Sequence, residues 1–181
     1  PDGVVTDIYP AEGNEAGKID LIHDKDRGEI SCYARDNHTV ITQGPFELKQ
    51  GDYGIAVRNP VYLTDTNKQE YFWGFTIVIL RVPDIFSDSI YALSNFGYKY
   101  RISKTASPWS DTYKVVYQSD GSLTQPVSYD FKIGAENWRF EVTPQSGWRN
   151  NTLIAVVTVF FSCRNPASDS SYPGMAGVQR K

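Results

Sequence analysis

One ten-residue stretch, residues 71–80, constrains the fold of this chain more than any other feature. It reads Tyr-Phe-Trp-Gly-Phe-Thr-Ile-Val-Ile-Leu, so its apolar and aromatic residues are nearly continuous. Such a short run, rich in β-branched and aromatic residues, is typical of a strand. Because the run does not alternate with polar residues, we expect both faces to be covered. The sequence therefore predicts a sheet with this strand at its centre.

Further β-prone runs and turn signals surround this strand. The turns are indicated by Gly51-Asp52, Asp120-Gly121 and Gly134-Ala135, and such short connections favour antiparallel pairing. Gly44-Pro45 is expected to break one strand and Pro60 to halt or bulge another. The predicted strands are residues 4–8, 39–42, 46–48, 53–57, 61–62, 98–103, 114–117, 127–133 and 138–143.

Two helices are predicted between the strands. The first begins at a capping Asp24, carries apolar residues Ile30, Tyr33 and Ala34 at helical spacing, and ends near residue 37. The second covers about residues 85–94 and is closed by Gly97. Its apolar side consists of Ile85, Phe86, Ile90 and Leu93. Strands and helices in this order predict an α+β domain, an antiparallel sheet flanked by helices.

Composition excludes some classes of protein. The chain has 40% hydrophobic, 22% charged and 14% aromatic residues, so it can bury a core. The net charge is −3 and the 18 Lys and Arg residues form no basic run, which argues against a nucleic-acid partner. Cys32 and Cys163 are too few for a disulfide scaffold, and whether they pair is left open.

No pattern of catalytic chemistry is present in the sequence. There is no nucleophile elbow, phosphate loop, zinc motif or dinucleotide fingerprint. The acidic residues Asp20, Asp24, Asp26 and Glu29 lack the spacing of a calcium loop and fit a charged helix start better. We therefore expect a protein that is not an enzyme and that has no catalytic residues, metal or cofactor.

The C-terminal part differs in character from the rest. Residues 152–163 are an apolar run of twelve residues, whereas a membrane-spanning helix needs about 20. Residues 164–181 are rich in Ser, Pro, Gly and basic residues, which is typical of a disordered tail.

An ordered set of short motifs resembles the CHASE domain, the extracytoplasmic sensory module of bacterial and plant receptors. The motifs are Ile8-Tyr9-Pro10, Gly13-Asn14-Glu15, Gly17-Lys18-Ile19-Asp20-Leu21, Gly44-Pro45-Phe46-Glu47-Leu48, the segment 54–62, Phe72-Trp73-Gly74-Phe75, and residues 138–142 with Pro144, Gly147 and Trp148. The resemblance implies a PAS-like fold outside the cytoplasm, held between two membrane helices that precede a histidine kinase or a diguanylate cyclase. It also implies a small-molecule ligand and a homodimer in the full receptor.

This resemblance gives a domain scheme. Residues 1–148 are the sensory domain without its first long helix, residues 149–163 are a possible remnant of the second membrane helix, and residues 164–181 are the tail. The membrane is then reached only through flanking helices that this chain lacks. Two other interpretations stay open: a dimerisation or protein-interaction module that binds no small molecule, and a receptor fragment without signalling output.

Six residues are candidates for ligand binding. By resemblance, Gln43 stands where plant relatives place a ligand-facing threonine, although a turn residue bonded to its own backbone fits equally. Arg58 interrupts an apolar strand, and its guanidinium can hold a carboxylate or phosphate, unless it faces solvent. Trp73 and Phe75 are expected on one face of their strand, with Phe72 and Gly74 on the other, either flanking a ligand or as ordinary core. Tyr9 and Tyr53 are weaker candidates.

Overall fold

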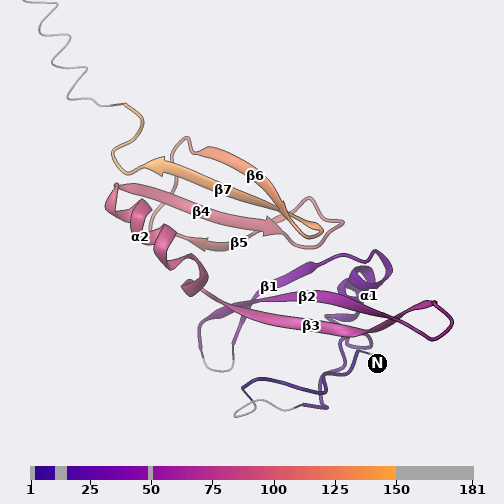
Figure 1. Cartoon of the computed structure of the whole chain (residues 1–181). Coiled ribbons are helices and arrows are strands. Elements are labelled where there is room, and N and C mark those ends of the chain that lie inside the picture. Colours follow the sequence, from indigo (N-terminus) through magenta and orange to yellow (C-terminus); the bar gives the residue numbers. More distant parts are fainter. Residues whose placement is uncertain (1–2, 11–15, 49–50, 150–181) are drawn as a thin grey trace, which may run out of the picture. The chain divides into compact units, whose positions relative to one another are not determined.

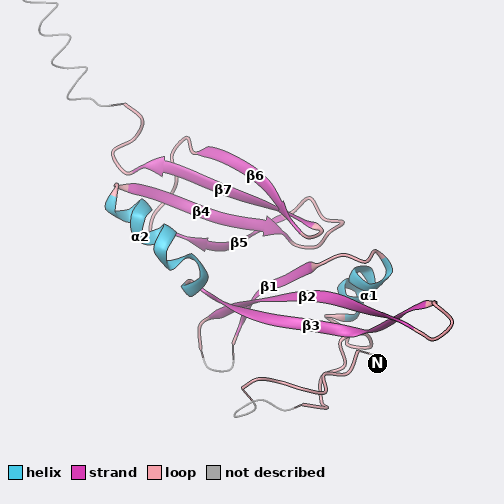
Figure 2. Cartoon of the chain, in the orientation of Figure 1, coloured by secondary structure: helices cyan, strands magenta, loops and turns pink. Residues whose placement is uncertain are grey.

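The computed structural model describes residues 3–10, 16–48 and 51–149 and shows an α+β fold (Figures 1 and 2). The elements, in chain order, are α1 (Gly28–Asp36), β1 (Ile41–Glu47), β2 (Tyr53–Thr64), β3 (Glu70–Val82), the 3-10 turn η1 (Asp84–Phe86), α2 (Ser87–Asn95), β4 (Tyr98–Thr105), β5 (Tyr113–Gln118), β6 (Val127–Ile133) and β7 (Glu136–Pro144). They all lie in one unit, residues 1–145.

The strands form two antiparallel sheets. One sheet has the order β1-β2-β3 and the other β5-β4-β7-β6. Short connections join the neighbours β1-β2, β2-β3, β4-β5 and β6-β7. The turn signals at Gly51-Asp52 and Gly134-Ala135 lie in two of these connections, whereas Asp120-Gly121 lies between β5 and β6, which do not pair with each other. The α+β class with antiparallel sheet and helices is confirmed, and the structure adds that the strands divide between two sheets.

The prediction of a central strand over residues 71–80 is wrong. Among the described residues β3 pairs only with β2, so it is an edge strand. Tyr71, Trp73, Val78 and Ile79 are about half exposed, so neither face is fully covered. The nearly continuous apolar residues of β3 are explained instead by its position, because this strand borders the groove described below.

Local corrections have local causes. Residues 4–8 form no strand, and Val4 makes only an isolated bridge to Asp20. The helix α1 begins at Gly28, because the Asp24 carboxylate accepts the backbone N–H groups of residues 26 and 27 and so closes a separate turn before it. The strand β2 passes through Pro60 without interruption, since β1 pairs only with residues 53–58. A missing N–H at position 60 therefore costs no bond to β1.

The β1 strand likewise includes the predicted break at Gly44-Pro45. The pairing with β2 shifts between Gln43 and Phe46, so the two intervening residues form an irregularity inside one strand. The second helix is close to its prediction, with η1 and α2 over residues 84–95 and Gly97 in a left-handed conformation after it.

The two sheets share a core and a polar junction. Ile55 and Val82 of the first sheet pack with Ile102, Val116 and Trp138 of the second. The amphipathic face of α1 makes a second cluster, in which Ile30 and Ala34 pack on Ile41 of β1. This cluster holds α1 against the three-stranded sheet.

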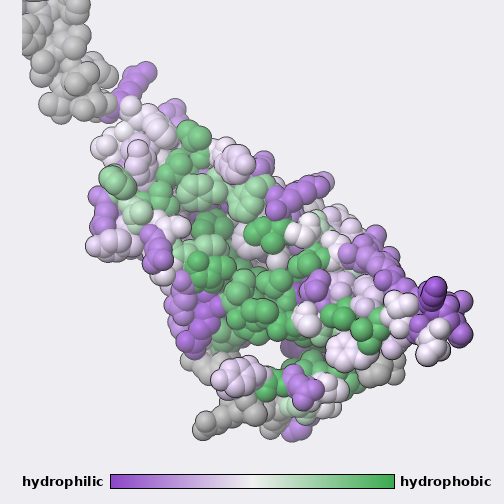
Figure 3. Space-filling model, in the orientation of Figure 1, coloured by the Kyte–Doolittle hydropathy of each residue, from purple (hydrophilic) through white to green (hydrophobic). Residues whose placement is uncertain are grey.

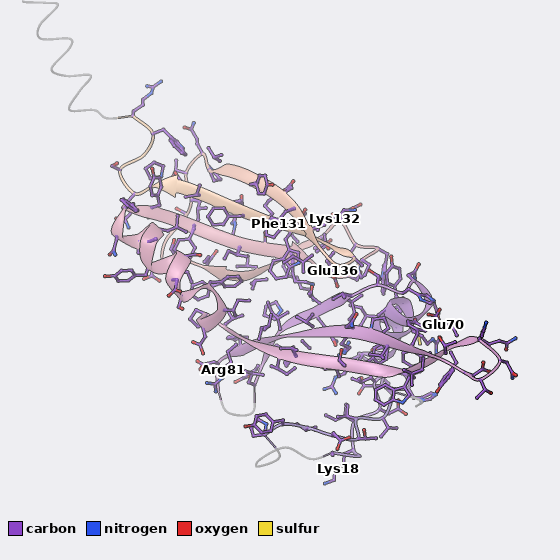
Figure 4. The ribbon with its side chains drawn as sticks, in the orientation of Figure 1. Lys18, Glu70, Arg81, Phe131, Lys132 and Glu136 are labelled. Carbon is purple, nitrogen blue, oxygen red and sulfur yellow. The ribbon has the colours of Figure 1, made fainter. Side chains whose placement is uncertain are left out.

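The polar junction lies where β1 meets the turn before β7 (Figure 4). The backbone N–H of Thr42 donates to Oε1 of buried Glu136 at 2.9 Å, and the N–H of Ala135 donates to the Val40 carbonyl at 3.0 Å. Gly134 has a φ of 58°, and a Cβ there would lie 2.1 Å from the Val40 carbonyl oxygen. Only glycine allows this approach.

Some sequence predictions fall outside the described residues. These are the apolar run 152–163, the tail 164–181 and any pairing of Cys163. In the part of the chain that the structure describes, no helix combines the length and apolar character needed to cross a bilayer. Cys32 there is a free, half-buried thiol.

Candidate functional site

A groove of about 1750 Å³ borders the three-stranded sheet. The N-terminal segment 3–10 lines one side of it, and the start of α1, β1, β2 and β3 line the others. Figure 3 shows hydrophobic side chains gathered over this sheet, above a hollow that separates them from the N-terminal segment. Concave, mostly apolar sites of this kind are where proteins bind small molecules.

The strand register determines which residues face each other in the groove. Gln43 on β1, Ala56 on β2 and Ile79 on β3 are directly paired and share a face. In the next row of the same face, Arg58 is paired with Ile77. Gln43 and Arg58 thus meet on one face of the sheet, as two candidate ligand-binding residues would.

Arg58 is the most unusual residue of the groove. It is 3% exposed, so the solvent-facing alternative is wrong. Its Nη2 donates to Oε1 of Gln43, while Nε and Nη1 have no hydrogen-bond partner among the described residues. Burial, with a smaller contribution from the charge of Arg27, lowers the pKa of Arg58 to about 10, against a weaker opposing effect of Asp24. A buried cation with free donors is rare unless an anion satisfies it.

Gln43 holds Arg58 in place. Its Nε2 donates to the Asp26 carbonyl oxygen at 3.3 Å, and its Oε1 accepts from Arg58. The alternative of a turn residue bonded to its own backbone is therefore wrong. The amide links β1, β2 and the turn before α1.

The aromatic candidates are arranged differently from the prediction. The register between β2 and β3 shifts between residues 61 and 62, which leaves Trp73 as an extra, bulged residue. Beyond the bulge Phe72 turns to the face of Phe75, and the ring centroids are 5.0 Å apart at an interplanar angle of 63°. The predicted opposition of Phe72 and Phe75 is therefore wrong.

Trp73 and Phe75 themselves differ in burial. Phe75 packs against the cluster of Ile30, Ala34 and Ile41, so it is largely core. Trp73 is 47% exposed and borders the groove. It is the aromatic candidate that a ligand can reach.

The two weaker candidates lie apart. Tyr9 borders the groove on the N-terminal segment but is 98% exposed. Tyr53, at the start of β2, is also exposed and does not line the groove. Gln43, Arg58, Trp73, Phe75 and Tyr9 are thus brought to one groove, and Tyr53 is not.

The sequence reasoning missed Arg27. It belongs to the charged run 24–27, whose pattern indicates only a helix start, and the structure places it at the groove near Arg58. Asp20 in the same region accepts the N–H groups of Ile22 and His23 and so closes a local turn. No cluster of three or more His, Cys, Asp or Glu residues suited to a metal occurs within the described ranges.

The fold and groove define a class: an α+β domain with two antiparallel sheets and a groove beside one of them. The sequence profile of the CHASE domain matches residues 3–112. The chain therefore belongs to the CHASE domain family, whose members are extracytoplasmic sensory domains. The predicted family is confirmed.

A solved structure has a similar fold. It is the extracellular ligand binding receptor from Desulfohalobium retbaense DSM5692, with a TM-score of 0.52 and 15% sequence identity. The likeness covers 78% of this chain and 28% of that receptor, so this chain spans under a third of the receptor's length. At this identity the likeness shows the fold. Comparison with curated proteins finds no match.

Proposed function

We propose that this CHASE domain is the sensory part of a transmembrane receptor of the histidine kinase or diguanylate cyclase type. It binds a small molecule in the groove beside β1, β2 and β3 and passes a change of shape to the rest of the receptor. The observation that carries the proposal is Arg58, a buried guanidinium with two unpartnered N–H donors in a groove large enough for a ligand. The solved protein of similar fold is itself an extracellular ligand binding receptor, which is in accord with this function.

The route of the change begins at β1. Gln43 and Thr42 are neighbours on this strand, and they bond in different directions: Gln43 to Arg58 and the Thr42 N–H to Glu136. A ligand that moves Gln43 therefore moves a strand that is hydrogen-bonded to the start of β7. The β7 strand leads to the C-terminal part of the chain. A shift between two arrangements of this junction is enough to couple the groove to the C-terminal part of the chain.

The location of the binding site is tested with two matched substitutions in the three-stranded sheet. Ile79 on β3 and Leu63 on β2 are exposed to similar extents, 48% and 41%, but only Ile79 lines the groove. A library of small molecules is screened by thermal shift against the wild type, Ile79→Trp and Leu63→Trp. Ligands of the wild type raise its melting temperature. We expect Ile79→Trp to lose this response and Leu63→Trp to keep it; equal responses in the two variants contradict the site.

One observation favours a second function, docking of a second copy of this chain. The edge strand β3 exposes Trp73, Val78 and Ile79, and unpaired edges recruit further strands. Light scattering after gel filtration distinguishes this function. A dimer that Val78→Glu dissociates, in a chain that responds to no compound of the library, supports docking instead of sensing.

A further inference from the structure

The geometry points to a monocarboxylate as the ligand of the groove, with its two oxygens held by Arg58 and its charge further balanced by Arg27. This inference rests on the proposed sensory function and names the chemical class that the site recognises.

The first step is the geometry of the guanidinium. An arginine offers two edges with paired donors, one of Nε with Nη2 and one of Nη1 with Nη2. Gln43 occupies Nη2, the atom common to both edges, with a single neutral oxygen. Nη2 carries one N–H on each edge and Nε and Nη1 have no partner, so Gln43 half fills one edge and the other edge is empty. A carboxylate has two oxygens at the right spacing to fill one whole edge, which an amide lacks.

The pair Arg101 and Glu141 shows the filled arrangement in the same molecule. There Nε donates to Oε2 at 2.6 Å and Nη2 donates to Oε1 at 2.9 Å. Arg58 has the donors of this arrangement without its carboxylate. Gln43 fills only one N–H of Nη2, so a ligand carboxylate can take the edge that has no partner.

The second step is the charge around the site. Arg27 is close enough to Arg58 to lower its pKa, so two like charges face the groove there. An anion between them relieves their repulsion and compensates the buried charge of Arg58. The charged residues that line the groove are four carboxylates and four cations: Asp7, Asp26, Glu29, Glu47, Arg27, Arg58, Arg81 and Lys114. The groove thus has no surplus of positive charge, which favours a ligand with one negative charge, a monocarboxylate, over a phosphate.

The third step is the apolar wall. Beyond Arg58 the same face continues with Ile77 and Ile79 of β3, and the half-exposed Trp73 lies further along that strand. A ligand that anchors its carboxylate at Arg58 thus lays its body along an apolar and aromatic surface. A carboxylate on an apolar or aromatic body fits both parts of the groove.

The decisive variant is Gln43→Glu, which supplies the chain with its own carboxylate at the Nη2 atom. We expect it to raise the melting temperature of the ligand-free protein, while the matched Gln43→Met does not. A gain that disappears when the pH falls below the glutamate pKa identifies the new ion pair as its cause. No gain at neutral pH overturns the assigned geometry.

The ligand class is tested with matched acids and primary amides, including phenylacetate with phenylacetamide, and with inorganic phosphate. Acids are expected to raise the melting temperature of the wild type, and amides and phosphate are not. Gln43→Glu, whose carboxylate already neutralises Arg58 and repels an anion, is expected to bind the acids about tenfold or more weakly. Arg27→Gln should weaken binding as well, whereas Arg35→Gln, at the far end of α1 and paired with Asp36, should leave it unchanged.

The outcomes separate this inference from the proposed function. If amides stabilise the protein as well as acids do, or phosphate equals them, the ligand class is wrong, and the groove remains a sensory site. If acids fail and neutral compounds of the library still depend on Ile79, the class is also wrong and the function stands. If neither acids nor any library compound stabilises the wild type, both proposals are overturned.

Discussion

Replacing Arg58 with methionine should make the ligand-free protein more stable, although it removes the main binding group. Burial and Arg27 hold the pKa of Arg58 at about 10, more than two pH units below the ordinary value of an arginine. Each pH unit corresponds to about 1.4 kcal/mol, so the buried charge costs the folded state about 3 kcal/mol. Methionine keeps most of the volume and removes the charge, and it loses one hydrogen bond, worth about 1 kcal/mol. The expected net gain in the free energy of unfolding is about 2 kcal/mol.

Urea unfolding at pH 7 measures this gain, with Arg101→Met as the matched control. Arg101 makes two hydrogen bonds to the Glu141 carboxylate, so its loss should lower the free energy of unfolding by about 1–2 kcal/mol. The sign for pH follows from the lowered pKa of Arg58. Its charge destabilises the folded state at every pH below about 10, and the penalty fades only as the pH rises toward the unfolded value.

The difference between the wild type and Arg58→Met should thus stay constant from about pH 6 to 9. A loss of stability in Arg58→Met as large as in Arg101→Met would refute the reasoning. It would show that the guanidinium is satisfied within the protein and needs no ligand. A gain is the pattern expected of a binding residue, because functional groups are often kept at the expense of stability.

Two further predictions concern the scaffold of the site. Gly134→Ala should lower the free energy of unfolding by about 2 kcal/mol or more, because its Cβ would clash with the Val40 carbonyl and its φ is positive. The control Gly74→Ala has no atom within 4 Å of the new Cβ and should change the free energy of unfolding little. Similar urea midpoints for the two variants would contradict the close contact between Gly134 and Val40. Glu141→Gln should cost about 1–2 kcal/mol at pH 7. Since Arg101 lowers the pKa of Glu141, the wild type's advantage should shrink as the pH falls below the ordinary carboxyl value and disappear below the lowered pKa, and a difference that does not change on acidification would exclude the ion pair as its source.

Local patterns predicted most of the secondary structure because local chemistry decides it. Residues 127–133 form a strand with the predicted bounds, and Ile30, Tyr33 and Ala34 lie on the buried side of α1. The prediction was wrong where a side chain competed with the backbone, as at Asp24. Its carboxylate closes a turn, and the helix cap lies three residues later, at Arg27.

Local patterns did not show which residues distant in the sequence pair in the folded sheet. The apolar residues 71–80 are compatible with a central strand and with an edge strand beside a groove, and only the pairing shows the edge. The bulge at Trp73 depends on the register with β2, so the faces of Phe72 and Phe75 were not visible in the spacing.

The same distinction between local sequence signals and tertiary contacts applies to the candidate site. The sequence by itself determined the family, the α+β class and the choice of Gln43 and Arg58, because motifs and a charge inside an apolar strand are local signals. Only the tertiary structure decided that Arg58 is buried with Nε and Nη1 unpartnered, that Gln43 accepts from its Nη2, and that Arg27 adds a second charge. Burial and charge at a point depend on every element packed around it. Here α1, β1 and β2 meet at that point only after the chain has folded.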